Sequence, residues 1–358
     1  LGVSILLGSC GNDGGNDTTI SFDRREMLSD YAANIIIPAY SDLQSEVNAL
    51  KTSTEAFASA PDNDNLQAAQ LAWTNAYLAW QSANAFNFGP AGEQGTRKGL
   101  IEEIGTFPAA ETKIETAIAA NDHSLNNFDR DARGFLALEY LLFGKNKSTS
   151  ELIAEFRGTP SRQAHIKAIA NHLKTRVDEV VNGWATYQSE FLNNNGTDAG
   201  SSTSALYNEF VRSFESAKNF KVGLPAGKRP GQTKPEPQLV EAFYSGLSLT
   251  MLKAHLQSIE AIYYGRGNNS ASGLGFKNYL ESVEGGKELV ALTEAQWQKV
   301  KDALNAVPTD QPFSVLVANN HPTVDALHTE LQKHTRFFKS DMSSLLGIAI
   351  TFSSGDGD

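Results

Sequence analysis

Apolar residues recur every three or four positions over most of this chain, whereas the strict alternation that marks a β-strand is hard to find. The pattern predicts an all-α protein. Two prolines, Pro38 and Pro108, fall inside helical stretches and are expected to kink or split them. The predicted helices cover residues 23–59, 64–88, 97–119, 129–143, 161–192, 203–220, 237–264, 286–306 and 322–351.

Two pairs of segments from different parts of the chain align without gaps. Residues 80–89 match 214–223, an offset of 214 − 80 = 134, with serine, alanine, phenylalanine and glycine coinciding. Residues 137–144 match 258–265, an offset of 260 − 139 = 121. Chance similarity between amphipathic helices is the alternative for either match alone. Because the two matches follow the same order and their offsets differ only by the length of a loop, we interpret them as a tandem duplication.

A tandem duplication of helical segments predicts two similar four-helix-bundle domains, with any shared site where they meet. We expect the N-terminal bundle to cover residues 22–158 and the C-terminal bundle residues 159–358. The second match places a glutamate in an apolar helix end in both copies, as Glu139 and Glu260.

The first residues of the chain have the features of a bacterial export signal. Residues 1–9 resemble the end of a signal peptide, and Leu7-Gly-Ser-Cys10 resembles a lipobox, in which the cysteine is acylated. A small buried cysteine near a frayed terminus is the alternative for Cys10, the single cysteine. Residues 10–21 contain few apolar side chains and are expected to form a flexible tether.

Composition narrows the choice of partners. With 41% hydrophobic residues the chain can bury a sizeable core, and its net charge of −11 argues against nucleic acid as a partner. No apolar run reaches the roughly 20 residues of a membrane-spanning helix. We therefore expect membrane contact through the lipid anchor only, and a location in the bacterial cell envelope, either periplasmic or surface-exposed.

Glu139 lies among apolar neighbours in the segment 133–144, and Glu260 repeats that situation. An ionised carboxylate is costly to bury unless it meets a cation, a metal or several donors. An ion pair with Arg133 or another arginine is the structural alternative for Glu139. Two carboxylates at a domain interface would form an oxygen-rich pocket for a hard cation or a polar ligand, and Glu139 is the candidate metal ligand.

His255 lies five residues before Glu260, about 140° around a helix, so the two cannot share one face as metal ligands. Ser248, seven residues before His255, does share its face. A packed helix more often holds a lone histidine as a core residue than as a ligand. The six other histidines show no metal-binding spacing and are interpreted as surface or capping residues: His123, His165, His172, His321, His328 and His334.

Trp80 belongs to an aromatic series at helical spacing, for which core packing is the natural explanation. Arg97 opens a predicted helix, where a cation opposes the helix dipole and needs an anion that Glu139 could supply. No catalytic serine elbow, phosphate-binding loop or cysteine nucleophile is present. The candidate ligand-binding residues are Glu139, Glu260, His255, Ser248, Arg133, Arg97 and Trp80.

Four segments together carry a family resemblance. They are Phe88-Gly-Pro90, residues 134–144, residues 244–260 with Tyr244-Ser-Gly-Leu-Ser248 and Glu260, and Leu346-Gly-Ile-Ala-Ile-Thr-Phe352. In these segments the chain resembles the imelysin-like proteins over most of its length. The resemblance implies an all-helical fold of two similar four-helix bundles, a site at their interface, an envelope location and a role in iron acquisition.

The family was once assigned as metallopeptidases because of a Gly-x-His-x-x-Glu motif. Gly134 and Glu139 match this motif, but Leu136 stands where the family has histidine. Leucine cannot ligate a metal, and catalytic zinc usually needs about three protein ligands, so a metallopeptidase is the disfavoured alternative.

The expected function is therefore that of a binding or accessory lipoprotein in iron or haem uptake. Its ligand would be a small molecule, haem, iron or another divalent metal, and an outer-membrane transport protein would be its partner. A purely structural surface protein is the third alternative.

Overall fold

The computed structural model of the protein describes residues 22–94, 97–267 and 272–352. Within these ranges every regular element is helical, and the two isolated β-bridges extend into no strand. The predicted all-α class is confirmed. No helix in the described ranges is long and apolar enough to cross a bilayer. The predictions for residues 1–21, including acylation of Cys10, lie outside the described residues.

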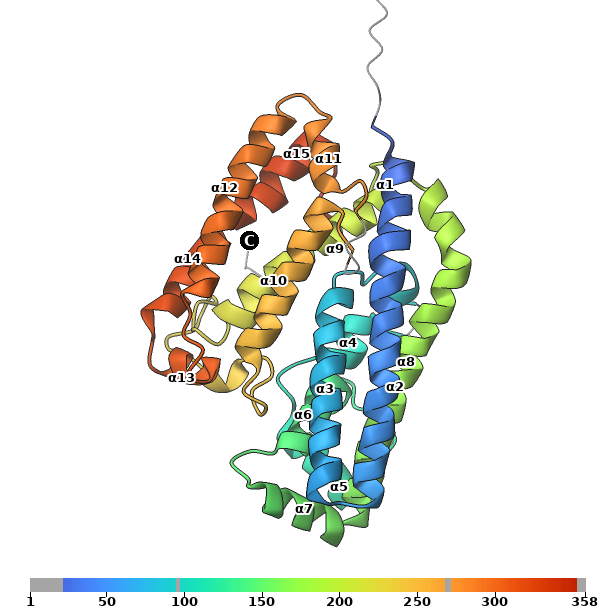
Figure 1. Ribbon diagram of the computed structural model, residues 1–358, viewed down its shortest axis with the longest axis vertical. Helices are drawn as coiled ribbons and strands as arrows, with labels where there is room; N and C mark the ends of the chain where they lie inside the picture. Colours follow the sequence, from blue (N-terminus) through green and yellow to red (C-terminus); the bar gives the residue numbers. More distant parts are fainter. Residues whose placement is uncertain (1–21, 95–96, 268–271, 353–358) are drawn as a thin grey trace, which may run out of the picture.

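Three long helices of the first half lie side by side, and shorter helices pack against them (Figure 1). A capping aspartate begins the chain's first helix, which continues through one π-helical turn into the second. The helices of this half are α1 (Arg24–Tyr31), α2 (Ile37–Ser59), α3 (Asn63–Ala83), α4 (Leu100–Ile104), α5 (Glu111–Ala119), α6 (Gly134–Phe143), α7 (Thr149–Gly158) and α8 (Pro160–Asn193).

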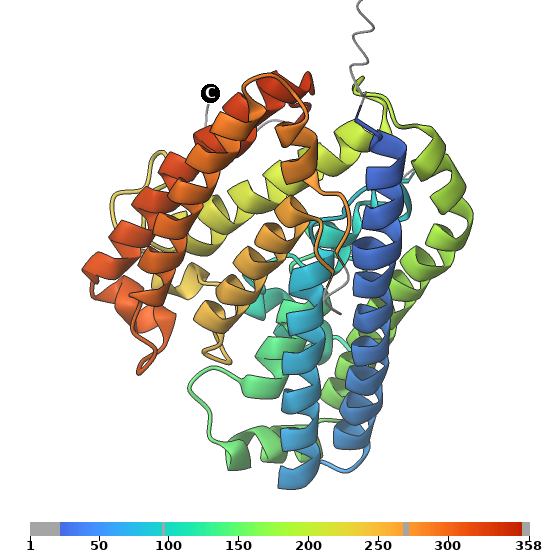
Figure 2. The same cartoon turned by 45° about the horizontal axis from the view of Figure 1, so that its top comes forward.

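The second half forms a separate group beside the first, drawn in yellow to red in Figures 1 and 2. It also contains π-helical turns over Ala217–Gly223 and Phe337–Asp341. Its helices are α9 (Ser202–Ser216), α10 (Ser248–Tyr264), α11 (Phe276–Glu281), α12 (Gly286–Asn305), α13 (Phe313–Ala318), α14 (Pro322–Arg336) and α15 (Met342–Leu346).

Helix α8 packs with the first half, against α2, α6 and α4. We had expected residues 159–193 to open the C-terminal bundle, because they follow the first copy of the repeated segments. Packing corrects that boundary: the chain passes from the first half to the second between Asn193 and Ser202. The apolar face of α8 packs against α2, so α8 is the last helix of the first bundle.

Each half has an aromatic cluster of its own. In the first half, Trp73 stacks on Tyr77, which contacts Phe135 with ring centroids 5.0 Å apart. In the second half, Phe338 packs against Phe210, with centroids 4.6 Å apart. Tyr31 of α1 also packs on Phe276 of α11, so the two clusters belong to one continuous buried core.

Both prolines fall at irregularities of the helical pattern. Pro108 separates α4 from α5, as predicted. Pro38 lies in the first turn of α2, directly after the π-helical turn Ala32–Ile36, so the helical path continues through it. The predicted helix over 237–264 is wrong for residues 240–247, which form turns before α10, and residues 347–351 continue no helix.

The two glycines that the proposed duplication aligns have the same role. Gly144 ends α6 with φ of 68°, and Gly265 ends α10 with φ of 67°. Glycine is the residue that adopts such backbone angles at low cost, which explains why both positions hold it. The duplication itself stays a prediction.

Candidate functional site

A cavity of about 630 Å³ lies where the two halves meet. Helices α3 and α4 with the turn after α4 supply one wall, and α9, the following π-helical turn and α10 supply the other. Four aromatic side chains line it: Trp80, Phe107, Phe220 and Phe352. Its volume is within the range of small-molecule sites, and its apolar walls enclose a small number of polar groups.

A buried ion pair lies at the wall of this cavity. Lys221 Nζ is 3.0 Å from a carboxylate oxygen of Glu241, and both side chains are almost fully buried. Tyr77 donates a hydrogen bond of 2.7 Å to Glu241, and Lys221 donates one of 2.6 Å to Gln81 Oε1. Burial lowers the pKa of Lys221, while Glu241 opposes that shift. The pair joins the halves, because Tyr77 and Gln81 belong to α3.

Ser213 and His255 form a second polar group in the cavity wall. Ser213 Oγ lies 2.6 Å from His255 Nε2 and 3.3 Å from Asn84 Oδ1. Burial holds the pKa of His255 well below its usual range, and the charge of Lys221 adds to this effect. The imidazole is therefore neutral, and its Nδ1 has no hydrogen-bond partner among the described residues.

Glu139 lies in α6, fully buried, next to this network. Its Oε1 accepts hydrogen bonds from the backbone N–H of Ser245, at 2.8 Å, and from the Ser245 hydroxyl, at 2.7 Å. Its Oε2 has no partner in the part of the chain that the structure describes. Burial raises the pKa of Glu139 to about 8, against the opposing effect of Ser245 and with a further contribution from Glu241. The carboxyl group is thus mainly protonated at neutral pH.

A third carboxyl group, Glu209, lines the cavity from α9. Burial raises its pKa to about 7, although Arg212, 3.1 Å away, opposes the shift. Lys221, Glu241, Glu209 and neutral His255 together provide donors and acceptors around an aromatic-walled space. Such a set suits recognition of a small organic molecule with polar substituents.

The structure brings together three of the predicted site residues. Trp80 and His255 line the cavity. Glu139 lies behind it, close enough to help raise the pKa of Tyr77. Ser248 is buried in the first turn of α10, where its hydroxyl contacts the Ala242 carbonyl at 3.4 Å, and it does not line the cavity.

The expectation that Glu139 and Glu260 line one cleft is corrected by the structure. Glu260 Oε1 lies 2.9 Å from Lys301 Nζ, and its side chain is 26% exposed. Glu260 therefore belongs to a partly exposed ion pair of the second half. The two glutamates occupy similar places in their helices, but the turn that contains Ser245 contacts Glu139, and Lys301 of α12 contacts Glu260.

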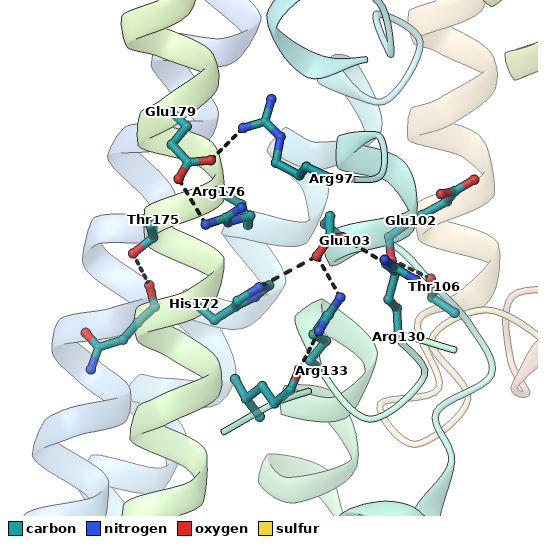
Figure 3. Close-up of polar contacts among 12 residues, drawn as sticks. Arg97, Glu102, Glu103, Thr106, Arg130, Arg133, His172, Thr175, Arg176 and Glu179 are labelled. Carbon is teal, nitrogen blue, oxygen red and sulfur yellow. Dashed lines mark hydrogen bonds and ion pairs between the residues drawn. The ribbon is translucent and has the colours of Figure 1, made fainter. Parts of the chain in front are cut away.

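Both predicted arginines bind anions other than Glu139 (Figure 3). Arg97 lies 2.6 Å from Glu179 of α8, and Arg133 lies 2.8 Å from Glu103 of α4. Glu103 also binds Arg130 at 2.8 Å. These pairs hold α4, α6 and α8 together, so we interpret both arginines as positioning residues of the first half.

Two histidines that we expected at the surface are buried. His165 is 1% exposed and His334 is fully buried in the aromatic core of the second half. His321 directly precedes α14, and its side chain accepts from the Thr323 N–H, as a capping residue does. The prediction of surface and capping roles thus holds for His321 and is wrong for His165 and His334.

Sequence reasoning missed the central residues of the cavity, Lys221, Glu241 and Ser213. Lys221 and Ser213 lie in or next to the repeated segment 214–223, so the repeat was a signal for them. Glu241 lies in a stretch that we assigned to a helix, and its apolar neighbours Leu239, Val240, Ala242 and Phe243 were a signal of burial, as for Glu139.

The residues present do not form a metal centre of the kind that the Gly-x-His-x-x-Glu motif implies. Leu136, one helical turn before Glu139, is 2% exposed and offers no ligand atom. The described residues contain no group of three or more His, Cys, Asp or Glu side chains placed to hold a metal ion. The Glu241 carboxylate is already engaged by Lys221 and Tyr77.

The fold and the cavity define a class: all-helical proteins in which two groups of helices meet at a polar, aromatic-walled pocket. The chain belongs to the imelysin family, because the family model described as Imelysin (Peptidase_M75) matches residues 36–336. A relative named iron-regulated protein A, from Synechococcus elongatus, is 22% identical over 337 residues, which is 91% of this chain and 85% of that protein.

Two solved structures share the fold. An iron-regulated protein A precursor from Parabacteroides distasonis has a TM-score of 0.73 and 19% identity, and covers 93% of this chain and 97% of its own. An imelysin-like protein from Psychrobacter arcticum has a TM-score of 0.72 and 20% identity, and covers 94% of this chain and 99% of its own. At these identities the likeness shows the fold alone.

Proposed function

We propose that this protein binds a small iron-associated ligand, a chelate or haem, in the cavity between its two halves and acts as a binding or accessory protein in bacterial iron uptake. The observation that carries this proposal is the buried Lys221–Glu241 pair at the wall of an aromatic-lined cavity of about 630 Å³. A buried ion pair is weak evidence for stability, so a role in recognition explains its position better. The name of the relative from Synechococcus elongatus supports the link with iron.

The polar groups favour an organic ligand over a bare ion. A bare divalent cation needs several oxygen or nitrogen ligands around one point. Here Glu139 is mainly protonated, Glu241 is paired and His255 offers a single nitrogen. A chelate or haem would meet Lys221 through an anionic group and pack its flat part against Trp80.

Peptidase chemistry is not part of this proposal. Hydrolysis by zinc requires about three protein ligands and a bound water. Leu136 removes the motif histidine, and Glu139 alone remains of the pair.

The proposed location is the cell envelope, with Cys10 as the acylated anchor and an outer-membrane transporter as the partner. The lipobox-like segment Leu7-Gly-Ser-Cys10 supports the anchor. Changing Cys10→Ser in the full precursor should abolish incorporation of labelled fatty acid. Unchanged incorporation would contradict the anchor.

Calorimetric titration tests the proposed ligand class. Ferric citrate, haem and ferrous iron are titrated into the wild type, Lys221→Met and Lys301→Met. We expect one of the two complexed forms to bind the wild type, with at least a tenfold loss in Lys221→Met and no change in Lys301→Met. Lys301 is the matched control, since its ion pair with Glu260 lies away from the cavity. Binding of ferrous iron alone, or no binding by any probe, would overturn the proposal.

A further inference from the structure

A second cavity, of about 460 Å³, lies within the first half and shares no lining residue with the cavity between the halves. Helix α5 and the segment 121–133 enclose it. Ala117 and Ala120, on one face of α5, form a flat apolar wall with Leu125 and Ala132. His165 and Arg133 are its two most deeply buried polar residues, with exposed fractions of 1% and 9%.

His165 presents an unpartnered acceptor. Asn121 Oδ1 lies 3.1 Å from His123 Nε2 and can only accept, so Nε2 of His123 carries the proton. His123 Nδ1 is then the acceptor for His165 Nδ1, at 3.3 Å. Burial, followed by the His123 ring, lowers the pKa of His165 and keeps its ring neutral. Its Nε2 therefore holds a lone pair, and no described residue donates to it.

Arg133 presents an unpartnered donor. Its terminal nitrogens bind Glu103 and the Leu125 carbonyl, but its Nε–H is buried without a partner among the described residues. Figure 3 shows Arg130 and Arg133 converging on Glu103. Two guanidinium groups share that single carboxylate, so Glu103 offsets only one of their two positive charges.

A buried acceptor and a buried donor without partners each cost stability unless a bound molecule satisfies them. We propose that this cavity is a second binding site, for an aromatic hydroxy acid. The hydroxyl of the ligand donates to His165 Nε2, its carboxylate accepts from Arg133 Nε–H, and its ring packs on the alanine face of α5. Because Arg133 shares its carboxylate partner with Arg130, its charge favours a carboxylate ligand over a neutral group.

Titration with 3-hydroxybenzoate tests this site, because its hydroxyl is not bonded to its own carboxylate and is free to donate. Benzoate and phenol are the controls that lack the hydroxyl or the carboxylate. We expect 3-hydroxybenzoate to bind the wild-type full chain at least tenfold more tightly than either control. Binding should also shift the ring NMR resonances of His165. Equal affinity of all three compounds, or no measurable binding of 3-hydroxybenzoate, would overturn the proposal.

Two matched substitutions in α5 locate the binding. Ala117→Phe fills the cavity without removing a polar group, whereas Ala119→Phe adds the same ring at an exposed position outside the lining. We expect Ala117→Phe to lose at least tenfold in affinity and Ala119→Phe to match the wild type. Wild-type affinity in Ala117→Phe would rule out this cavity. Lys221→Met should bind 3-hydroxybenzoate normally, which separates this test from that of the proposed function.

Discussion

At the scale of single residues, the protonation of Glu139 has a measurable effect on stability. Its pKa is raised from 4.5 to about 8 in the folded protein. Folded protein therefore binds more protons than unfolded protein between these values, and its free energy of unfolding falls as pH rises from about 4.5 to about 8. The whole effect is on the order of a few kcal/mol.

Glu139→Gln removes this titration and retains an oxygen that can accept from Ser245. We expect the wild type to lose stability relative to Glu139→Gln across pH 4.5 to 8, and the difference to be constant outside that window. Urea unfolding at a series of pH values measures it. Parallel curves for the two proteins would show that Glu139 titrates normally.

Leu136→His would restore the motif side chain that this chain lacks. The imidazole and Glu139 would lie three residues apart on one helix face, giving two ligands in place of one. We expect zinc affinity to rise at least tenfold over the wild type. Because Glu139 must lose its proton to bind, the gain should be larger at pH 8.5 than at pH 7. Calorimetric titration of zinc into both proteins measures the two affinities. Equal, negligible binding by both would exclude this position as a metal site.

Burial of Glu139 could be predicted from sequence, but its partners could not. An apolar run on every side of a glutamate predicts burial directly. The donor that satisfies it, Ser245, is 106 positions away in a turn whose geometry depends on packing of the two halves. Glu260 has a similar local sequence and a different environment, because Lys301 of α12 reaches it.

At the scale of elements, Gly134 fixes where α6 begins. It has φ of 76°, and a Cβ added there would lie 2.4 Å from the Ile104 carbonyl oxygen. Gly285, before α12, has nearly the same φ, 75°, but a Cβ there would meet nothing within 4 Å. Both positions require a positive φ, but an added Cβ would meet a neighbouring group only at Gly134.

We expect Gly285→Ala to cost about 1 kcal/mol, from backbone strain alone. Gly134→Ala should cost about 2 kcal/mol more, since α6 must also move away from α4. Urea unfolding gives both values. Equal losses would mean that the α4–α6 contact adapts to a methyl group.

The helix pattern predicted most long helices closely, because apolar periodicity reports the face that each one buries. It failed over residues 240–247, which carry helix-compatible residues but form turns that bring Ser245 to Glu139. It also misassigned α8. Periodicity shows that a helix buries a face, and contains no information on which neighbour covers it.

At the scale of the whole molecule, Tyr31 ties α1 to the second half. Its hydroxyl donates to the Ile262 carbonyl at 2.6 Å and accepts from the Phe276 N–H at 3.0 Å. Tyr40, equally buried, donates to the Phe86 carbonyl at 2.8 Å within the first half. Removing the Tyr31 hydroxyl leaves the buried Phe276 N–H unpaired, whereas the Ile262 carbonyl still accepts from the Gly265 N–H at 3.2 Å. Removing the Tyr40 hydroxyl leaves no group unpaired, because the Phe86 carbonyl still accepts from the Phe88 N–H at 2.8 Å.

We therefore expect Tyr31→Phe to cost about 1 to 3 kcal/mol and Tyr40→Phe about 1 kcal/mol or less. Amide hydrogen exchange at Phe276 should accelerate in Tyr31→Phe only. An unchanged Phe276 exchange rate would show that another group takes over the bond.

The position of α8 has a consequence for the order of events in synthesis. Once residue 193 has been made, the chain contains every helix of the first bundle and every residue that lines the cavity beside His165. The cavity between the halves needs His255 from α10 and Phe352 from the segment after α15, so it does not exist on a partly made or partly exported chain. If the chain crosses a membrane unfolded, this cavity can therefore take up a ligand only after export, in the compartment where folding is completed.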